Sequence, residues 1–261
     1  MSDTVSLSDF DLNEHHHHHN EDHHHGRLSF IQTNLIADPT LSAQLNDPNL
    51  INPWGVSFSS SSPFWISDNG TGLTSIDSVD SSGNVTLNRI PAVTIPTPDG
   101  TGTSAPTGQV FNSFSSDKAF TLSHKNPATF LFATEDGTIA GWNVGDPNNP
   151  NTTAITVVDN STAGPNGGAV YKGLAIANSD YGPTLYATNF RDGTVDMFDQ
   201  NFNQIGSFSD PCIPDGFAPF NVQVLDDKLY VTYAKQDDAK HDDVAGKGNG
   251  FVDVFDLDGN L

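Results

Sequence analysis

The residues of this chain that could do chemistry recur at matching points of a repeated unit. They begin the first strand of a unit or directly follow its second strand: Asn52, Trp54, Asp68, Asn69, Glu135, Asp136, Lys172, Asn189, Arg191, Asn221 and Lys235. We interpret the set as a pocket in which Lys172, Arg191 and Lys235 hold an anionic ligand, with Glu135 or Asp68 as a base or metal ligand. The alternative is structural, because Asp, Asn and Gly are turn formers and the cations offset nearby carboxylates.

A histidine tract near the N-terminus offers a second chemistry. Eight of the ten histidines lie in two runs that an Asn-Glu-Asp segment separates. Clustered imidazoles bind Zn²⁺, Ni²⁺ or Cu²⁺, so each histidine of the tract is a candidate transition-metal ligand: His15, His16, His17, His18, His19, His23, His24 and His25. The other interpretation is a disordered, solvated tail with no metal-handling role.

The oxygen-bearing residues near the repeats would also suit calcium, a hard cation that prefers carboxylate and carbonyl ligands. No spacing matches an EF-hand loop, and the run from Asp237 to Asp243 reads more simply as a solvated acidic loop. Outside the tract only His124 and His241 occur, and we expect both at the surface. No Gly-x-Ser-x-Gly motif or P-loop is found, which argues against a serine hydrolase or a P-loop enzyme.

The charge balance is strongly acidic. The chain has 261 residues, with 10 Lys and Arg against 32 Asp and Glu, and a net charge of -22. Such a surface repels nucleic acid and anionic membranes, so we expect neither as a partner. No apolar run approaches the roughly 20 residues of a spanning helix, and we expect a monomer without a membrane span. The single Cys212 excludes an internal disulfide.

Short strand-like segments return four times, and they set the fold class. The first unit predicts strands over 55–58, 64–67, 73–79 and 85–90, followed by a long connection over 91–107. Its second strand has counterparts at 132–136, 186–190 and 230–234. Because a four-stranded sheet of this kind buries its faces only against neighbouring sheets, the repeat predicts an all-β propeller.

The domain organisation follows from the same pattern. We expect a disordered His-rich tail over residues 1–27 and a propeller domain over residues 28–261. The turn Asp258-Gly259-Asn260 follows a third strand, so the last unit is interrupted in mid-blade. We therefore expect four blades of a six-bladed ring, in a chain that is an N-terminal fragment.

Several segments together resemble a known family. They occur in order over residues 28–261: Phe30–Leu35, Asn52–Gly55, Ala133–Trp142, Tyr171–Ala175, Asn189-Phe190 and Ala218–Gln223. These segments are similar to an uncharacterised bacterial β-propeller family with NHL-like repeats. The resemblance implies two further blades and an exported or cell-surface protein, in some members with a C-terminal PEP-CTERM sorting signal. Residues 1–14 lack the features of a signal peptide, and the family implies no established reaction.

Three functional hypotheses remain open. The first is a binding or scaffolding propeller with a site for an unidentified small molecule or protein on the top face of the channel, formed by Trp54, Asp68, Asn69, Glu135, Lys172, Asn189, Arg191 and Asn221. The second is a metal-assisted hydrolase or lactonase that uses carboxylate and Asn ligands at the same face. The third is a metal-sequestering surface protein that acts through the histidine tract.

Overall fold

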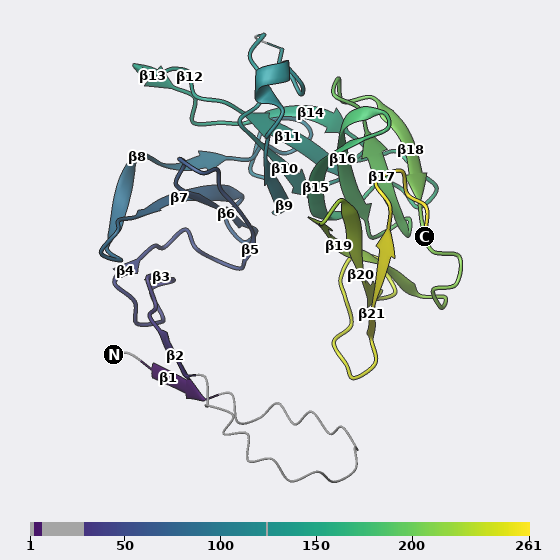
Figure 1. Ribbon diagram of the computed structural model, residues 1–261, viewed down its shortest axis with the longest axis horizontal. Helices are drawn as coiled ribbons and strands as arrows, with labels where there is room; N and C mark the ends of the chain where they lie inside the picture. Colours follow the sequence, from purple (N-terminus) through teal and green to yellow (C-terminus); the bar gives the residue numbers. More distant parts are fainter. Residues whose placement is uncertain (1–2, 7–28, 124) are drawn as a thin grey trace, which may run out of the picture.

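The protein is built almost entirely from small β-sheets. The computed structural model describes residues 3–6, 29–123 and 125–261 (Figure 1). The histidine tract, His124 and most of the tail expected over residues 1–27 lie outside these residues. Near the N-terminus, β1 (Asp3–Ser6) pairs with β2 (Ser29–Gln32), and β3 (Ile36–Ala37) pairs with β4 (Leu45–Asn46).

Four antiparallel sheets follow one another along the chain, and we call them blades 1 to 4. Blade 1 consists of β5 (Pro53–Ser57), β6 (Phe64–Asp68), β7 (Leu73–Val79) and β8 (Val85–Thr94). Blade 2 consists of β9 (Pro106–Phe111), β10 (Phe130–Thr134), β11 (Thr138–Trp142) and β14 (Ile155–Asp159). Blade 3 consists of β15 (Tyr171–Ser179), β16 (Gly182–Asn189), β17 (Thr194–Phe198) and β18 (Gln204–Phe208). Blade 4 consists, in the described residues, of β19 (Phe217–Leu225), β20 (Lys228–Lys235) and β21 (Gly250–Phe255).

The blades are arranged in an arc around a common axis. Figure 1 shows the first strand of each blade, β5, β9, β15 and β19, turned toward the centre of the arc, and each contacts the next. Later strands of each blade lie toward the outside. This arrangement confirms the predicted all-β propeller architecture.

The hydrophobic core lies between blades, as a propeller requires. Trp65 of blade 1 stacks on Phe130 of blade 2 with ring centroids 4.3 Å apart, and Trp142 completes the cluster. Blades 2 and 3 bury a second cluster, and blades 3 and 4 a third that includes Tyr186 and Phe255. Each blade therefore depends on its neighbour for burial of its apolar face.

The structure differs from the predicted elements at the end of blade 1. Strand β8 runs to Thr94, whereas the sequence predicted a connection from residue 91. Its pairing with β7 is interrupted near Ile76, where Asn88 Nδ2 donates to the Ile76 carbonyl at 2.7 Å. The resulting bulge lets the strand resume beyond Pro91, which is why a Pro-containing segment still belongs to the sheet.

Small elements occupy the connections of blade 2. They are the 3₁₀ turn η1 (Ser115–Asp117) and the hairpin of β12 (Gly145–Asp146) with β13 (Asn149–Pro150). Across the described ranges, no helix has the length and apolar character needed to cross a membrane.

Candidate functional site

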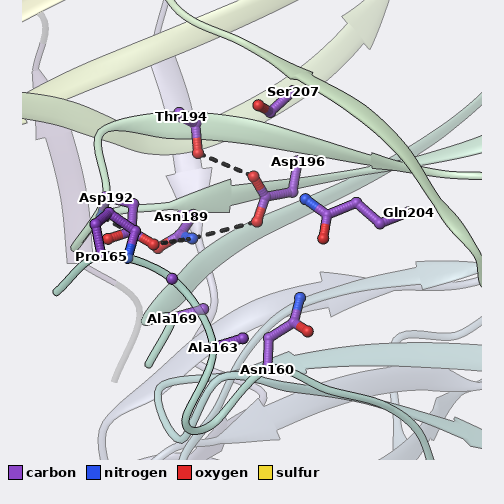
Figure 2. Close-up of a pocket in the computed structure, with 11 residues that line it drawn as sticks. Asn160, Ala163, Pro165, Ala169, Asn189, Asp192, Thr194, Asp196, Gln204 and Ser207 are labelled. Atoms are coloured by element: carbon purple, nitrogen blue, oxygen red, sulfur yellow. Dashed lines mark hydrogen bonds between the residues drawn. The ribbon is translucent and has the colours of Figure 1, made fainter. Parts of the chain in front are cut away.

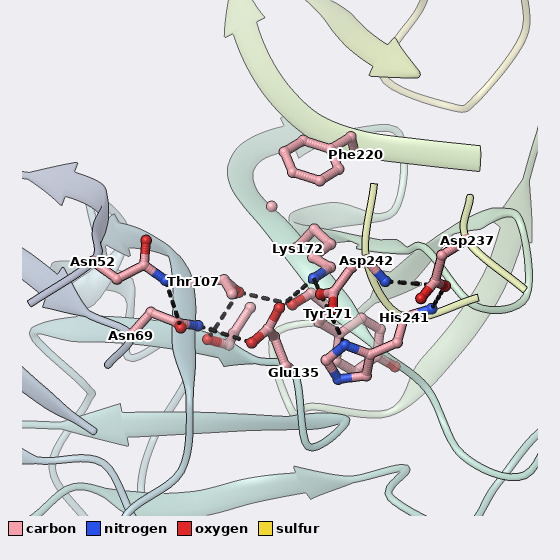
Figure 3. A network of polar contacts seen from close by, with 12 residues as sticks. Asn52, Asn69, Thr107, Glu135, Tyr171, Lys172, Phe220, Asp237, His241 and Asp242 are labelled. Carbon is pink, nitrogen blue, oxygen red and sulfur yellow. Dashed lines mark hydrogen bonds and ion pairs between the residues drawn. The ribbon is translucent and has the colours of Figure 1, made fainter. Parts of the chain in front are cut away.

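A buried ion pair between Glu135 and Lys172 lies where blades 2 and 3 meet (Figure 3). Glu135 directly follows β10, and its backbone N–H donates to the Ala105 carbonyl at 3.0 Å. Lys172 is the second residue of the inner strand β15. The Lys172 side chain is 1% exposed and the Glu135 side chain 11% exposed. Because an unpaired charge is costly to bury, each side chain depends on the other.

Two amides from blade 1 extend this pair. Asn69 Nδ2 donates to Glu135 Oε2 at 2.9 Å, while Lys172 donates to Glu135 Oε1. Asn52 Nδ2 in turn donates to Asn69 Oδ1 at 3.0 Å. Asn52 has a φ of 51°, in the left-handed region that Asn tolerates better than most residues. The structure thus brings together Asn69, Glu135 and Lys172, as their places in the repeat predicted.

Aromatic rings cover the ammonium group of Lys172. Its Nζ lies 5.1 Å from the Trp54 ring centroid, 5.8 Å from that of Phe190 and 6.0 Å from that of Phe220. The Phe220 ring also contacts the other two rings, with centroids 5.6 Å apart in each case. Cation–π attraction in such a partly desolvated place adds about 0.5–2 kcal/mol to the binding of the ammonium. Sequence reasoning selected Trp54 but missed the two phenylalanines.

A loop of blade 4 completes the cluster from the other side. Asp242 Oδ1 lies 3.5 Å from Lys172 Nζ, and the His241 ring contacts the same oxygen at 3.0 Å. The hydrogen bond with His241, with help from the charge of Lys172, holds the pKa of Asp242 below its usual range. Asp237 fixes the loop by accepting the His241 backbone N–H at 2.8 Å. This loop follows the second strand of its blade, as Glu135 does, and that equivalence could have identified it.

We call this group the channel-mouth cluster: Asn52, Trp54, Asn69, Glu135, Lys172, Phe190, Phe220, His241 and Asp242. Next to it, a cavity of about 260 Å³ runs along the inner strands. Trp54, Gln109, Lys172, Phe220, Asn221 and Gln223 contribute to its walls. A second cavity of about 300 Å³ shares several of these walls and is lined further along by Phe58, Phe111 and Ile176. Polar and aromatic side chains thus line both cavities.

Asn221 lies in this channel wall, as predicted. It is exposed, and its side-chain oxygen accepts the Val222 backbone N–H at 2.8 Å. The side-chain amide of Asn221 is thereby held in place on the cavity wall, where a ligand could reach it.

Asp68, in contrast, is turned into blade 1. Its carboxylate is fully buried and accepts the Ser75 backbone N–H at 3.1 Å, while Oδ1 has no partner in the described residues. Burial is the main reason that the pKa of Asp68 rises to about 7, and the nearby Asp47 and Asp77 raise it further. Asp77 shows the same effect, with burial raising its pKa to about 6.

We expect the Asp68→Asn variant to become more stable than the wild type as the pH rises. The raised pKa means that the folded state binds more protons than the unfolded state between about pH 4 and 7. The contribution of Asp68 to stability is therefore greatest below pH 4 and is lost as pH rises through 7. Urea unfolding should show a gain of up to about 4 kcal/mol at pH 8 and little gain at pH 4.

The exposed Asp80 supplies the control for this prediction. Hydrogen bonds from Asn84 lower its pKa, so Asp80→Asn should show no gain at high pH. An Asp68→Asn variant whose stability follows that of the wild type at every pH would contradict the prediction.

Asn189 belongs to a separate pocket between blade 3 and the connection that precedes it (Figure 2). Its Nδ2 donates to Asp192 Oδ2 at 3.1 Å and to Asp196 Oδ2 at 3.2 Å. The Tyr171 hydroxyl donates to Asp196 Oδ2 at 3.0 Å, and burial raises the pKa of Asp196. Since these polar groups satisfy one another, the network first of all joins the strands of blade 3 to the preceding connection.

Two other cations were predicted for the same site, Arg191 and Lys235. Arg191 Nη1 donates to the Gly168 carbonyl at 3.2 Å, and Lys235 is exposed at the end of β20. Neither takes part in the polar network drawn around Lys172 (Figure 3). Within the described residues, Lys172 is therefore the cation of the channel-mouth cluster.

Glu135, His241 and Asp242 could in principle hold a metal ion, since each has a ligand atom within 4.8 Å of the other two. The Lys172 ammonium, however, already lies against Glu135 and close to Asp242. A cation bound there would have to displace a buried charge of the protein. Calcium at this face stays a prediction, and the transition-metal ligands of the histidine tract lie outside the described residues.

Comparison with known proteins found relatives in a virus. Two uncharacterized proteins of Acanthamoeba polyphaga mimivirus are similar to this chain. One is 30% identical over 235 residues, covering 87% of this chain and 54% of that protein. The other is 32% identical over 236 residues, covering 87% of this chain and 58% of that protein. The chain therefore spans somewhat more than half the length of these relatives.

Among solved structures, similar chains include a candidate 6-phosphogluconolactonase from Bacteroides fragilis. The two structures have a TM-score of 0.45 and are 17% identical in sequence, and the match covers 78% of this chain and 58% of that chain. A protein from Lactobacillus plantarum has a TM-score of 0.47 and 15% identity over the same shares. No family model matches the chain. The bacterial family, the two further blades and export stay predictions.

Proposed function

We propose that this chain is a ligand-binding propeller whose site is the channel-mouth cluster and the cavity beside it. The observation that carries the proposal is the placement of Lys172, an almost fully buried ammonium held by groups from all four blades. Blade 1 contributes Trp54, blade 2 Glu135 and blade 4 Phe220. Such convergence of polar and aromatic groups beside a cavity is typical of small-molecule sites.

Binding is favoured over catalysis by the way the polar groups are used. A general base needs a free acceptor atom within hydrogen-bonding reach of its substrate. Both oxygens of Glu135 already accept, one from Lys172 and one from Asn69. The same contacts make the site rigid before a ligand arrives, which lowers the entropy lost on binding.

A metal-assisted hydrolase is the second candidate function, and the proximity of Glu135, His241 and Asp242 is the observation that favours it. A single His and two carboxylates would leave coordination positions for water and substrate. Metal sequestration by the histidine tract is a third possibility, which concerns residues outside those described.

A thermal-shift screen can separate these functions. The full chain would be used, with the eight tract histidines replaced by Ala so that metal effects report on the propeller. The panel contains sugars, nucleosides, amino acids, organic acids, Ca²⁺, Mn²⁺ and Zn²⁺. We expect an organic ligand to raise the Tm, and its affinity to fall about tenfold or more in Trp54→Ala. Tyr181→Ala removes a 64% exposed ring elsewhere and should leave binding unchanged.

Two results would overturn the binding proposal. One is that no organic compound of the panel raises the Tm. The other is a ligand whose affinity is the same in Trp54→Ala and Asn221→Ala as in the wild type. Binding of Mn²⁺ or Zn²⁺ that disappears in His241→Ala would instead favour the hydrolase.

A further inference from the structure

We infer that the ligand of the channel mouth is an uncharged, polyhydroxylated molecule of the size of a simple sugar. The inference rests on the proposed function and names the ligand class for the same site. It follows from three properties of the described residues: the charge around Lys172, the occupancy of the aromatic rings and the groups that remain free to bind.

An anionic ligand does not suit the site, although the cation Lys172 lies in it. Lys172 carries +1 while Glu135 and Asp242 carry −1 each, so the three groups sum to −1. An anionic ligand would have to compete with two carboxylates for the same ammonium and leave Glu135 buried without its partner. Among the described residues that line the cavity, Lys172 is the one charged side chain.

An organic cation does not suit the site either. Aromatic rings gathered around one point are the usual receptors for ammonium ligands. Here the rings of Trp54, Phe190 and Phe220 already surround the ammonium of Lys172 at 5.1–6.0 Å. A second positive charge placed against these rings would be repelled by the first.

The groups that remain favour hydroxyls. The walls of the cavity carry the side-chain amides of Asn221 and Gln223, both exposed, and Trp54 is only partly buried. Amides donate and accept hydrogen bonds, as hydroxyl groups do. The part of the indole ring that stays exposed offers an apolar surface for the C–H face of a sugar ring. The volume of about 260 Å³ is small for a ligand site and fits one or two such rings.

The test uses probes that differ only in charge. Glucose, glucosamine and glucuronate share one ring and carry zero, positive and negative charge, and corresponding galactose and mannose sets vary the hydroxyl geometry. Binding is measured on the full chain by isothermal titration calorimetry, which reads the wild type and the variants of Trp54 in the same way. We expect a neutral sugar of one set to bind at least about tenfold more tightly than both charged counterparts.

Two further results are expected. Binding of the neutral sugar should weaken at least tenfold in Trp54→Ala and in Asn221→Ala, and remain unchanged in Tyr181→Ala. Its affinity should also stay the same between 0.05 and 0.5 M salt, because no charge of the ligand is screened.

The two proposals fail in different ways. A uronate or an amino sugar that binds more tightly than its neutral counterpart would overturn the ligand class and leave the site intact. The class is also wrong if no sugar binds while another compound of the thermal-shift panel binds at Trp54. If no organic compound of either panel binds, the proposed function itself falls.

Discussion

Replacing Lys172 by Met should lower the free energy of unfolding by about 3–5 kcal/mol, the range observed when one partner of a buried ion pair is removed. Met fills much of the space beneath the rings of Trp54 and Phe220, so packing should change little. The loss instead comes from Glu135, whose side chain is only 11% exposed and would keep its charge without a counterion. Urea denaturation of the full chain measures this loss in the free energy of unfolding.

Three companion variants show whether the pair is the cause. Lys235→Met removes an exposed lysine of blade 4 and should change stability by no more than about 0.5 kcal/mol. The double variant Lys172→Met with Glu135→Gln should recover most of the lost stability, since the Gln side-chain oxygen can still accept from Asn69. Together with Glu135→Gln alone it gives the coupling energy of the pair. A Lys172→Met protein within 1 kcal/mol of the wild type would contradict the buried-pair interpretation.

The blades could be predicted because their pattern is local. Alternating apolar residues and Gly-containing turns set each strand, and the second-strand segment beginning at Trp65 returns in blades 2, 3 and 4. Propeller topology then places the residue after each second strand at the same face. That is why Asn69 and Glu135 were expected to lie close together. In the structure, Asn69 Nδ2 lies 2.9 Å from Glu135 Oε2.

The direction of individual side chains was harder to predict. Asp68 and Asn69 are neighbours in sequence, but Asp68 is the last residue of β6 and faces the sheet, whereas Asn69 begins the turn and faces the channel mouth. Successive residues of a strand point to opposite sides, so a shift of one residue in the strand boundary exchanges the two roles. Asn189 is likewise the last residue of its strand, β16, and its side chain lies in the pocket of blade 3 rather than at the channel mouth.

The repeat indicates where a long loop begins, but not which contacts its side chains make. His241 and Asp242 lie in the connection between β20 and β21, which has no counterpart of equal length after the second strands of the other blades. The charges of this loop suggested a solvated segment, and its contact with Lys172 depends on how the loop folds back. A backbone hydrogen bond from Asp237 N–H to the Asp242 carbonyl, 2.9 Å long, closes it.

The inner strands approach one another so closely that glycine is required at three equivalent positions. A Cβ on Gly55 would lie 2.5 Å from the Thr107 carbonyl oxygen, and one on Gly173 would lie 2.8 Å from the Asn221 Cα. For Gly108 the contact is closest, 2.2 Å to the Leu174 backbone nitrogen. The cause is steric, because none of the three has a positive φ.

Replacing Gly108 by Ala should therefore destabilise the protein by about 3 kcal/mol or more, at or above the upper end for an overpacked site. A backbone neighbour cannot rotate away as a side chain can, so β9 and β15 must separate. Their separation would also move Lys172 away from Trp54 and weaken ligand binding at the channel mouth. The matched control is Gly206→Ala in β18, where an added Cβ meets no atom within 4 Å and φ is not positive. Gly206→Ala should be neutral or stabilise by about 0.5 kcal/mol, and equal stability of the two variants in urea would show that the close approach of the inner strands is not required.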